Sequence, residues 1–275
     1  MKVEFFGDRK TQLLGVTHRP SQTDSTLRAI VFVPPIGHEY IRTHWAMKLL
    51  AKQLARKHMH VLRFDLRGHG DSFGNPSEVR SLDAWRSDIN NAIDHCKERS
   101  GCDSVALLGL RAGAGLITDV ATTRDDVHSI IAWEPVLHGR RYLTELRRLH
   151  STMLDLWFER TQTVDESEYE EIIAWKYQRS LVEEMDQWRP PFESLALPHL
   201  VVESQSNPNP ALTPTNSMRK TVPVAEDYSW NRLCDLETAW LRPHSTRTLV
   251  NQIQNLFERL EQKGMLTPKR ELCLT

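Results

Sequence analysis

The segment from Val105 to Leu116 constrains the fold of this 275-residue chain more than any other. Its first four residues, 105–108, are apolar and predict a buried strand, and glycines at 109, 113 and 115 surround a tight turn. The mostly apolar residues 112–121 predict the helix that follows. A buried strand that passes through a glycine-rich turn into a helix is typical of parallel α/β sheets. The residue inside the turn is Arg111.

The same alternation of strand and helix continues along most of the chain. The other expected strands cover residues 28–33, 60–65, 129–133 and 199–203, with a weaker last strand at 222–225. The other expected helices cover residues 44–57, 82–97 and 245–263. Two short strands at 2–6 and 12–17, joined through Gly7-Asp8, predict a hairpin. We therefore predict a doubly wound, mostly parallel α/β sheet with an antiparallel N-terminal hairpin.

Residues 138–195 interrupt this alternation. Apolar side chains recur at helical spacing over 140–160 and again over 169–185, and an acidic stretch lies between them or opens the second. We expect two amphipathic helices here, forming a helical cap inserted over the carboxyl edge of the sheet. The whole chain, 1–275, is expected to form one domain, because no linker or internal repeat divides it.

Composition excludes several classes of function. The chain has 35 Lys and Arg against 36 Asp and Glu, a net charge of −1, so no basic excess points to nucleic acid. The four cysteines, at 96, 102, 234 and 273, form no C-x-x-C pair, and we expect no metal site and no cofactor. The first eight residues contain no long apolar run, and no segment is long and apolar enough to span a membrane. A cytoplasmic protein is therefore expected.

Three motifs occur in an order that resembles the α/β-hydrolase superfamily. Residues 33–38 lie where the oxyanion loop of that family follows its third strand, and 64–72 is similar to its D-x-R-G-x-G-x-S turn. Residues 109–113 correspond to the nucleophile elbow, G-x-S-x-G. The resemblance implies the fold and ester or amide hydrolysis. The position of the nucleophilic serine, however, holds Arg111, which has no lone pair with which to attack.

Shorter strings resemble a subgroup of this superfamily. Pro34-Pro35 with Glu39, the Gly-Leu-Arg at 109–111 and the Trp-Glu-Pro-Val at 133–136 are similar to exosortase-A-system-associated hydrolases and to serine aminopeptidase-like proteins. Membership of the first group implies that an arginine at the elbow is a trait of the family rather than an isolated change.

The other catalytic positions of the superfamily are only partly matched. In that template an acid and then a histidine follow the nucleophile. The usual acid position falls near Ser206 and Asn207, neither of which carries charge, so Glu134 is the alternative acid. His244, just before the last expected helix, is the candidate histidine. Each has an alternative structural role: Glu134 as the partner of an arginine at 140 or 141, and His244 as a loop residue beside a helix cap.

The position of Arg111 also suggests binding. A helix N-terminus offers free N–H groups and a positive dipole end, and a forked cation there suits a carboxylate or a phosphate. The candidate ligand-binding residues are Ile36, Gly37, His38, Arg111 and Ala112. In the alternative, a carboxylate of the chain itself pairs with the arginine, the candidates being Glu39, Asp65 and Glu134.

Three hypotheses of function follow from these residues. In the first, the protein has little or no serine-hydrolase activity and binds an anionic or acyl small molecule under the cap. In the second, it hydrolyses esters or amides through a non-standard pair, His244 with Glu134. In the third, it is a non-catalytic scaffold or partner-binding protein whose pocket is closed by an ion pair of Arg111.

Overall fold

The computed structural model describes residues 1–20, 28–157, 168–204, 219–224 and 243–266. Eight strands form one sheet in the order β1-β2-β4-β3-β5-β6-β9-β10. Their bounds are β1 Lys2–Phe6, β2 Leu13–His18, β3 Arg28–Val33, β4 Met59–Phe64, β5 Val105–Leu110, β6 Val127–Trp133, β9 His199–Ser204 and β10 Arg219–Val224. The pairs β1–β2 and β2–β4 are antiparallel and the other described pairs are parallel. This confirms the predicted sheet and its N-terminal hairpin.

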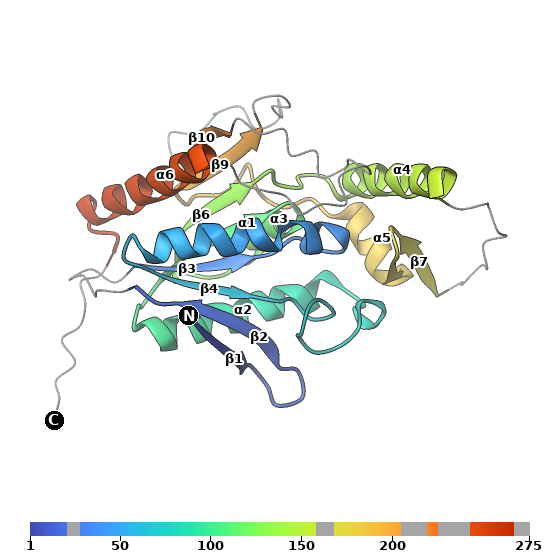
Figure 1. The fold of residues 1–275 in the computed structure, drawn as a ribbon, viewed down its shortest axis with the longest axis horizontal. Coiled ribbons are helices and arrows are strands. Elements are labelled where there is room, and N and C mark those ends of the chain that lie inside the picture. The colour runs from blue at the N-terminus through green and yellow to red at the C-terminus, as the bar shows by residue number, and fades with distance from the viewer. Residues whose placement is uncertain (21–27, 158–167, 205–218, 225–242, 267–275) are drawn as a thin grey trace.

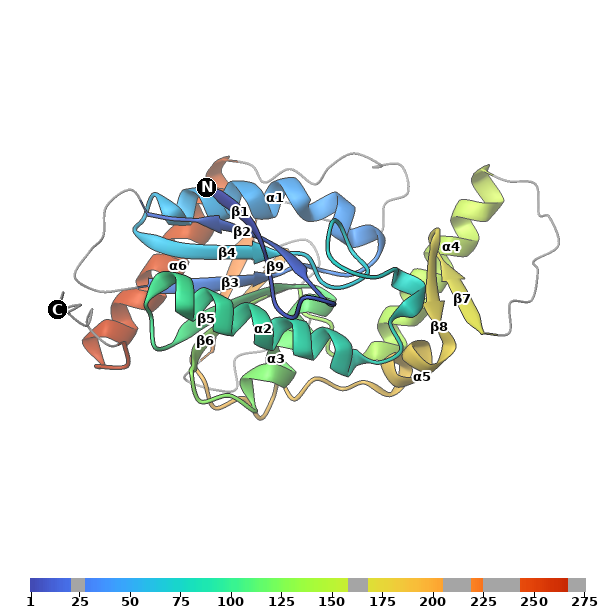
Figure 2. The ribbon, with the colours of Figure 1, turned by 90° about the horizontal axis from the view of Figure 1, so that it is seen from below.

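Helices cover both faces of the sheet, as Figures 1 and 2 show. Helices α2 (Leu82–Ser100) and α3 (Ala112–Ala121) cover one face, and α1 (His38–Ala55) and α6 (Pro243–Gln262) cover the other. A short 3₁₀ helix, Pro76–Glu78, follows the turn after β4. Two hydrophobic clusters form the core, one on each face. The strands between them are apolar on both sides, which explains why their sequences are continuous apolar runs rather than alternating ones.

Helix α1 begins earlier than the pattern predicts, at His38 instead of residue 44. Gly37, with φ of +61°, ends the preceding loop, and Glu39 lies in the first helical turn, where a negative charge complements the helix dipole. The buried residues of the first two turns are the polar Glu39 and Thr43. Because the prediction relied on the spacing of apolar residues, it missed these turns.

The segment 139–187 lies at one end of the sheet in Figures 1 and 2, and we call it the cap segment. It consists of α4 (Gly139–Trp157), β7 (Tyr169–Ile172), β8 (Trp175–Gln178) and α5 (Arg179–Gln187). The prediction of one helix over 169–185 is wrong in its first ten residues, which form an antiparallel hairpin. Ile173 and Ala174 have φ of +52° and +60°, so they form a tight turn that a helix cannot contain.

Several expectations fall outside the residues that the structure describes. The usual acid position near Ser206 and Asn207 and the cysteines at 234 and 273 belong to this group. Within the described ranges, no helix is both long and apolar enough to cross a membrane. The same ranges contain no group of three metal-ligating side chains close enough to hold an ion. That the chain is one domain remains a prediction.

Candidate functional site

The turn between β5 and α3 holds Arg111 in a backbone conformation that non-glycine residues rarely adopt, with φ of +54° and ψ of −118°. Such strain costs on the order of 1–3 kcal/mol and persists where the surroundings impose it. Here two backbone hydrogen bonds hold the turn, one to the end of β6 and one to the loop that follows it. The Arg111 N–H donates to the Trp133 carbonyl at 2.9 Å, and the Arg111 carbonyl accepts from the Val136 N–H at 3.2 Å.

Two glycines let the start of α3 approach the sheet. A Cβ atom on Gly109 would collide with the backbone of Gly113 and Ala114, and one on Gly113 would collide with the carbonyl oxygens of Val33 and Pro34. The turn therefore packs directly against the loop that follows β3. This brings the turn that carries Arg111 together with the Pro34 loop, which continues into the predicted ligand-binding residues at 36–38.

An ion pair occupies the side chain of Arg111. Its Nε donates to Oε1 of Glu39 at 2.9 Å, and its Nη2 lies 3.4 Å from Oε2 of Glu145. Glu39 is fully buried, and its second oxygen accepts a hydrogen bond of 2.8 Å from the Tyr142 hydroxyl. The Arg111 guanidinium also lies 5.6 Å from the centre of the Tyr142 ring. We call these four residues the Arg111 cluster.

The electrostatics of the Arg111 cluster favour a permanent cation. Burial by itself lowers the pKa of Arg111, but the negative charges of Glu39 and Glu145 outweigh it and raise that pKa above the usual value. Burial, followed by the charge of Glu39, raises the pKa of Tyr142 well above its usual value, so its hydroxyl keeps the proton that it donates. The cluster therefore combines one cation with two carboxylates from α1 and α4.

Glu39 was one of three predicted partners of Arg111. The second, Asp65, stabilises the turn after β4, where its carboxylate accepts from the Asp71 N–H at 3.3 Å. The third, Glu134, directly follows β6 with φ of +42° and donates its N–H to the Val202 carbonyl at 2.8 Å. Glu145 was missed as a partner. Its spacing from Tyr142, three residues on a helix, was the signal that both side chains share a face.

The loop after β3 is closed by groups that the sequence did not single out. The Gly37 N–H donates to Nε2 of His69 at 2.9 Å. The other ring nitrogen lies 3.2 Å from the Arg67 carbonyl, so it carries the proton and the ring is neutral. Burial lowers the pKa of His69 to about 4. From the sequence, His69 was only one residue of the 64–72 turn motif and had no role of its own.

The cap segment covers the same loop. Trp175 of β8 stacks on the His69 ring, with centroids 5.0 Å apart and planes 22° apart. The hydroxyl of Tyr177 lies so close to Gly37 that a Cβ atom there would overlap it. Because Tyr142 and Glu145 of α4 reach Arg111 as well, the cap segment contacts both halves of the site.

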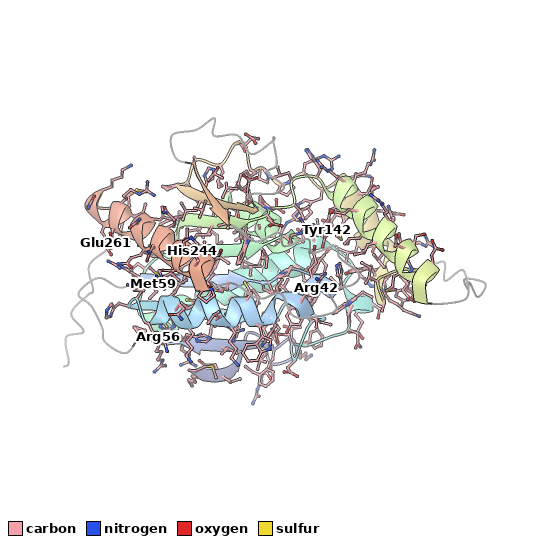
Figure 3. All side chains as sticks on the ribbon, turned by 45° about the horizontal axis from the view of Figure 1, so that its top comes forward. Arg42, Arg56, Met59, Tyr142, His244 and Glu261 are labelled. Carbon is pink, nitrogen blue, oxygen red and sulfur yellow. The ribbon has the colours of Figure 1, made fainter. Side chains whose placement is uncertain are left out.

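His244 and Glu134, the predicted catalytic pair, come from different elements. His244 is exposed in the first turn of α6, and Figure 3 shows it apart from Tyr142 of α4. Arg140, one of the two arginines expected to pair with Glu134, pairs with Asp186 at 2.8 Å. The catalytic roles of His244 and Glu134 remain predictions.

The parallel sheet, the strand–turn–helix at Arg111 and the loop after β3 together define the α/β-hydrolase fold. The family model of serine aminopeptidase, S33, matches residues 27–189, more than half of the chain, and the chain therefore belongs to this family. A search of curated proteins found no match.

Solved structures with the same fold are distant in sequence. Est1E from Butyrivibrio proteoclasticus with ferulic acid bound has a TM-score of 0.62 at 15% identity, over 93% of this chain and 98% of that one. An esterase from Pyrococcus furiosus has a TM-score of 0.61 at 12% identity, over 94% of this chain and 90% of that one. The thioesterase domain from the curacin biosynthetic pathway has a TM-score of 0.56 at 15% sequence identity, over 93% of this chain and 99% of that one. At these identities the likeness establishes the fold alone.

Proposed function

We propose that this protein is a non-catalytic scaffold or partner-binding protein with the α/β-hydrolase fold, and that it does not hydrolyse esters or amides through a nucleophile at the β5–α3 turn. The observation that carries the proposal is the buried ion pair between Arg111 and Glu39. In the hydrolase template the turn presents a serine hydroxyl to the substrate. Here it presents a guanidinium that stays protonated and is held by a fully buried carboxylate.

The ion pair also supports a structural use of the site. Removing one partner of a buried pair costs about 3–5 kcal/mol, because the other charge is left uncompensated. Arg111 and Glu39 therefore depend on each other, and Tyr142 attaches the pair to the cap segment. This arrangement favours the scaffold hypothesis, in which a non-catalytic scaffold or partner-binding protein has its pocket closed by the ion pair of Arg111.

A second candidate function is the binding of a small carboxylate or acyl ligand under the cap segment. The observation that favours it is the contrast between the two acids. Glu39 is fully buried at 2.9 Å, whereas the Glu145 side chain is 43% exposed and contacts Arg111 at 3.4 Å. A ligand carboxylate that replaces Glu145 would accept hydrogen bonds from the same edge of the Arg111 guanidinium. The bound ferulic acid of the related Est1E is itself a carboxylic acid.

The third candidate, hydrolysis through His244 and Glu134, is separated from the first two by a direct assay. The protein is incubated with short p-nitrophenyl esters and with a fluorophosphonate probe. We expect neither turnover above the buffer rate nor covalent labelling. Robust turnover that His244→Ala abolishes, or labelling of any serine, would overturn the proposal. An active serine esterase of the same fold serves as the positive control.

A thermal shift assay separates the first two candidates. With short carboxylates such as acetate and benzoate, the ligand hypothesis predicts stabilisation that Glu145→Gln increases, because that substitution removes the competing charge. The scaffold hypothesis predicts no shift in either protein. From the composition and the uninterrupted sequence we also propose a cytoplasmic, single-domain protein, and from the resemblance to exosortase-associated hydrolases we propose an exosortase-linked role. Fractionation of the source cells tests the location, and the gene neighbourhood tests the exosortase link.

A further inference from the structure

One face of the molecule combines exposed apolar side chains with lysines, and none of its residues belongs to the Arg111 cluster. It consists of Val3 and Phe5 on β1 and of Ile41, Trp45, Lys48 and Lys52 on α1, and we call it the β1–α1 face. The exposed fractions of its four apolar residues are 56%, 54%, 63% and 49% in that order. These are four of the seven large apolar side chains that are exposed in the described part of the chain.

The strand half of this face is set by the register of the hairpin. Val3 pairs with Val16 and Phe5 with Leu14, so these four side chains share one side of the sheet. The alternate residues point to the opposite side, where Phe6 stacks on His95 of α2. In Figure 1, α1 lies over β3 and β4, and no labelled helix covers β1 and β2 on the same side.

The helix half of this face carries apolar and basic groups without an exposed acid. On α1 the exposed residues include Ile41, Trp45 and Lys52, and Lys48 is half-buried with its Nζ 4.5 Å from the centre of the Trp45 ring. The only acidic residue of α1 is Glu39, which is fully buried in the Arg111 cluster. Arg56 and Lys57, both exposed, extend the positive charge beyond the end of the helix.

Contacts beneath the surface join the two halves. His18 of β2 is buried, its Nε2 accepts from Nε of Arg63 at 3.2 Å, and its pKa of about 4 results from burial and then from nearby positive charges that include Lys48 and Lys52. A small cavity of about 20 Å³ lies between α1 and β4, and its lining includes His44, Met47 and Arg63. Lys48 and Lys52 of α1 are therefore close enough to the end of β2 for their charges to act on His18.

We propose that the β1–α1 face docks on a membrane surface that contains anionic phospholipid. Aromatic and aliphatic side chains that insert at the headgroup level, flanked by lysines, are the chemistry of interfacial membrane binding. The charge of the face complements an anionic leaflet, where each lysine contributes on the order of 1 kcal/mol. Among the residues that the structure describes, the exposed acids nearest in sequence to this face are Asp8 and Asp71, which lie on turns, and Arg9 and Lys10 outnumber Asp8. The proposal is independent of the function proposed for Arg111.

Sedimentation with vesicles tests this proposal on the full chain. We expect binding to phosphatidylcholine vesicles with about 30% phosphatidylserine, and much weaker binding to pure phosphatidylcholine. The double variant Lys48→Gln with Lys52→Gln is expected to lower the partition coefficient for vesicle binding about 30-fold. This factor corresponds to the loss of about 1 kcal/mol for each of the two lysines. Phe5→Ser with Trp45→Ala is expected to remove binding that resists moderate salt, because it deletes the apolar insertion.

The matched control is Arg141→Gln with Arg148→Gln, which removes two exposed positive charges from α4 instead of α1. This control is expected to bind vesicles as the unchanged protein does. Equal losses in both double variants would indicate non-specific attraction and overturn the proposal, as would the absence of vesicle binding. Light scattering measures the oligomeric state. If the protein is a dimer and the double variant Phe5→Ser with Trp45→Ala is a monomer, the face binds a second copy of the chain and the proposal is overturned.

Discussion

Replacement of Glu39 by glutamine is the sharpest test of the Arg111 cluster. Glutamine keeps the shape of the side chain and an oxygen that accepts from Tyr142, but it removes the charge that faces Arg111. Because Glu39 is fully buried, the guanidinium loses a partner that water cannot replace. We expect a loss of about 3 kcal/mol in the free energy of unfolding, the lower end of the range for a broken buried pair. For a chain of this size, that loss lowers Tm by about 6–12 °C.

The matched control for this measurement is Glu145→Gln. Glu145 contacts the same guanidinium, but its side chain is 43% exposed and the distance is 3.4 Å. Solvent screens such a contact, so we expect a loss below about 1 kcal/mol. Unfolding in urea, followed by tryptophan fluorescence, measures both values, and differential scanning fluorimetry gives the Tm.

A double-mutant cycle completes the test. Arg111→Met with Glu39→Gln removes both charges, and it is expected to destabilise the protein less than Glu39→Gln alone, since no buried charge remains unpaired. Equal losses for Glu39→Gln and Glu145→Gln, or additive effects of the two changes in the double variant, would refute the view that the buried pair stabilises the turn.

Two further predictions concern the loop after β3. The pKa of His69 is lowered from about 6.5 to about 4, so its neutral form stabilises the fold above about pH 6.5 and this contribution is lost as the pH falls towards 4. The free energy of unfolding measured from pH 7 to 4 should fall less steeply in His69→Gln than in the unchanged protein. The same slope in both proteins would contradict this assignment. The control is His244→Gln, which changes a histidine at an exposed position. Gly37→Ala should destabilise the protein by more than about 2 kcal/mol, because alanine is strained at a φ of +61° and its Cβ meets the Tyr177 hydroxyl. Tyr177→Phe should recover part of that loss in the double variant, and no recovery would show that the overlap is unimportant.

Sequence periodicity located the elements of the central sheet well. The strand at 28–33 and the helix at 112–121 have the bounds that the pattern predicts. Strands that are buried on both sides must be apolar throughout, so they are visible in sequence as uninterrupted runs. The hairpin at 169–178 was missed because Ile173, Tyr177 and Leu181 are spaced four residues apart, which is also compatible with one face of a helix. Its turn depends on positive φ at Ile173 and Ala174, and neither isoleucine nor alanine is a residue type that predicts such a conformation.

The candidate site was predictable only in part. The strand, turn and helix around Arg111 follow from local residue types, because glycine is required wherever the backbone approaches another chain segment closely. The involvement of His69 was not predictable, since its hydrogen bond to Gly37 joins two loops that are 32 residues apart. The residue types around a histidine in such a turn do not indicate which backbone amide it will contact in the fold.

By itself, the sequence determined the α/β class, the hairpin at the edge and the presence of an arginine where the fold turns from β5 into α3. These properties depend on neighbouring residues, through burial, strand and helix periodicity and turn geometry. Only the tertiary structure decided which acid neutralises Arg111. Glu39 and Glu145 lie 72 and 34 residues away from it in the chain, and several other acids were equally plausible partners. The choice depends on how α1 and α4 pack over the end of the sheet, because only packing brings a buried carboxylate within hydrogen-bonding distance of a buried cation.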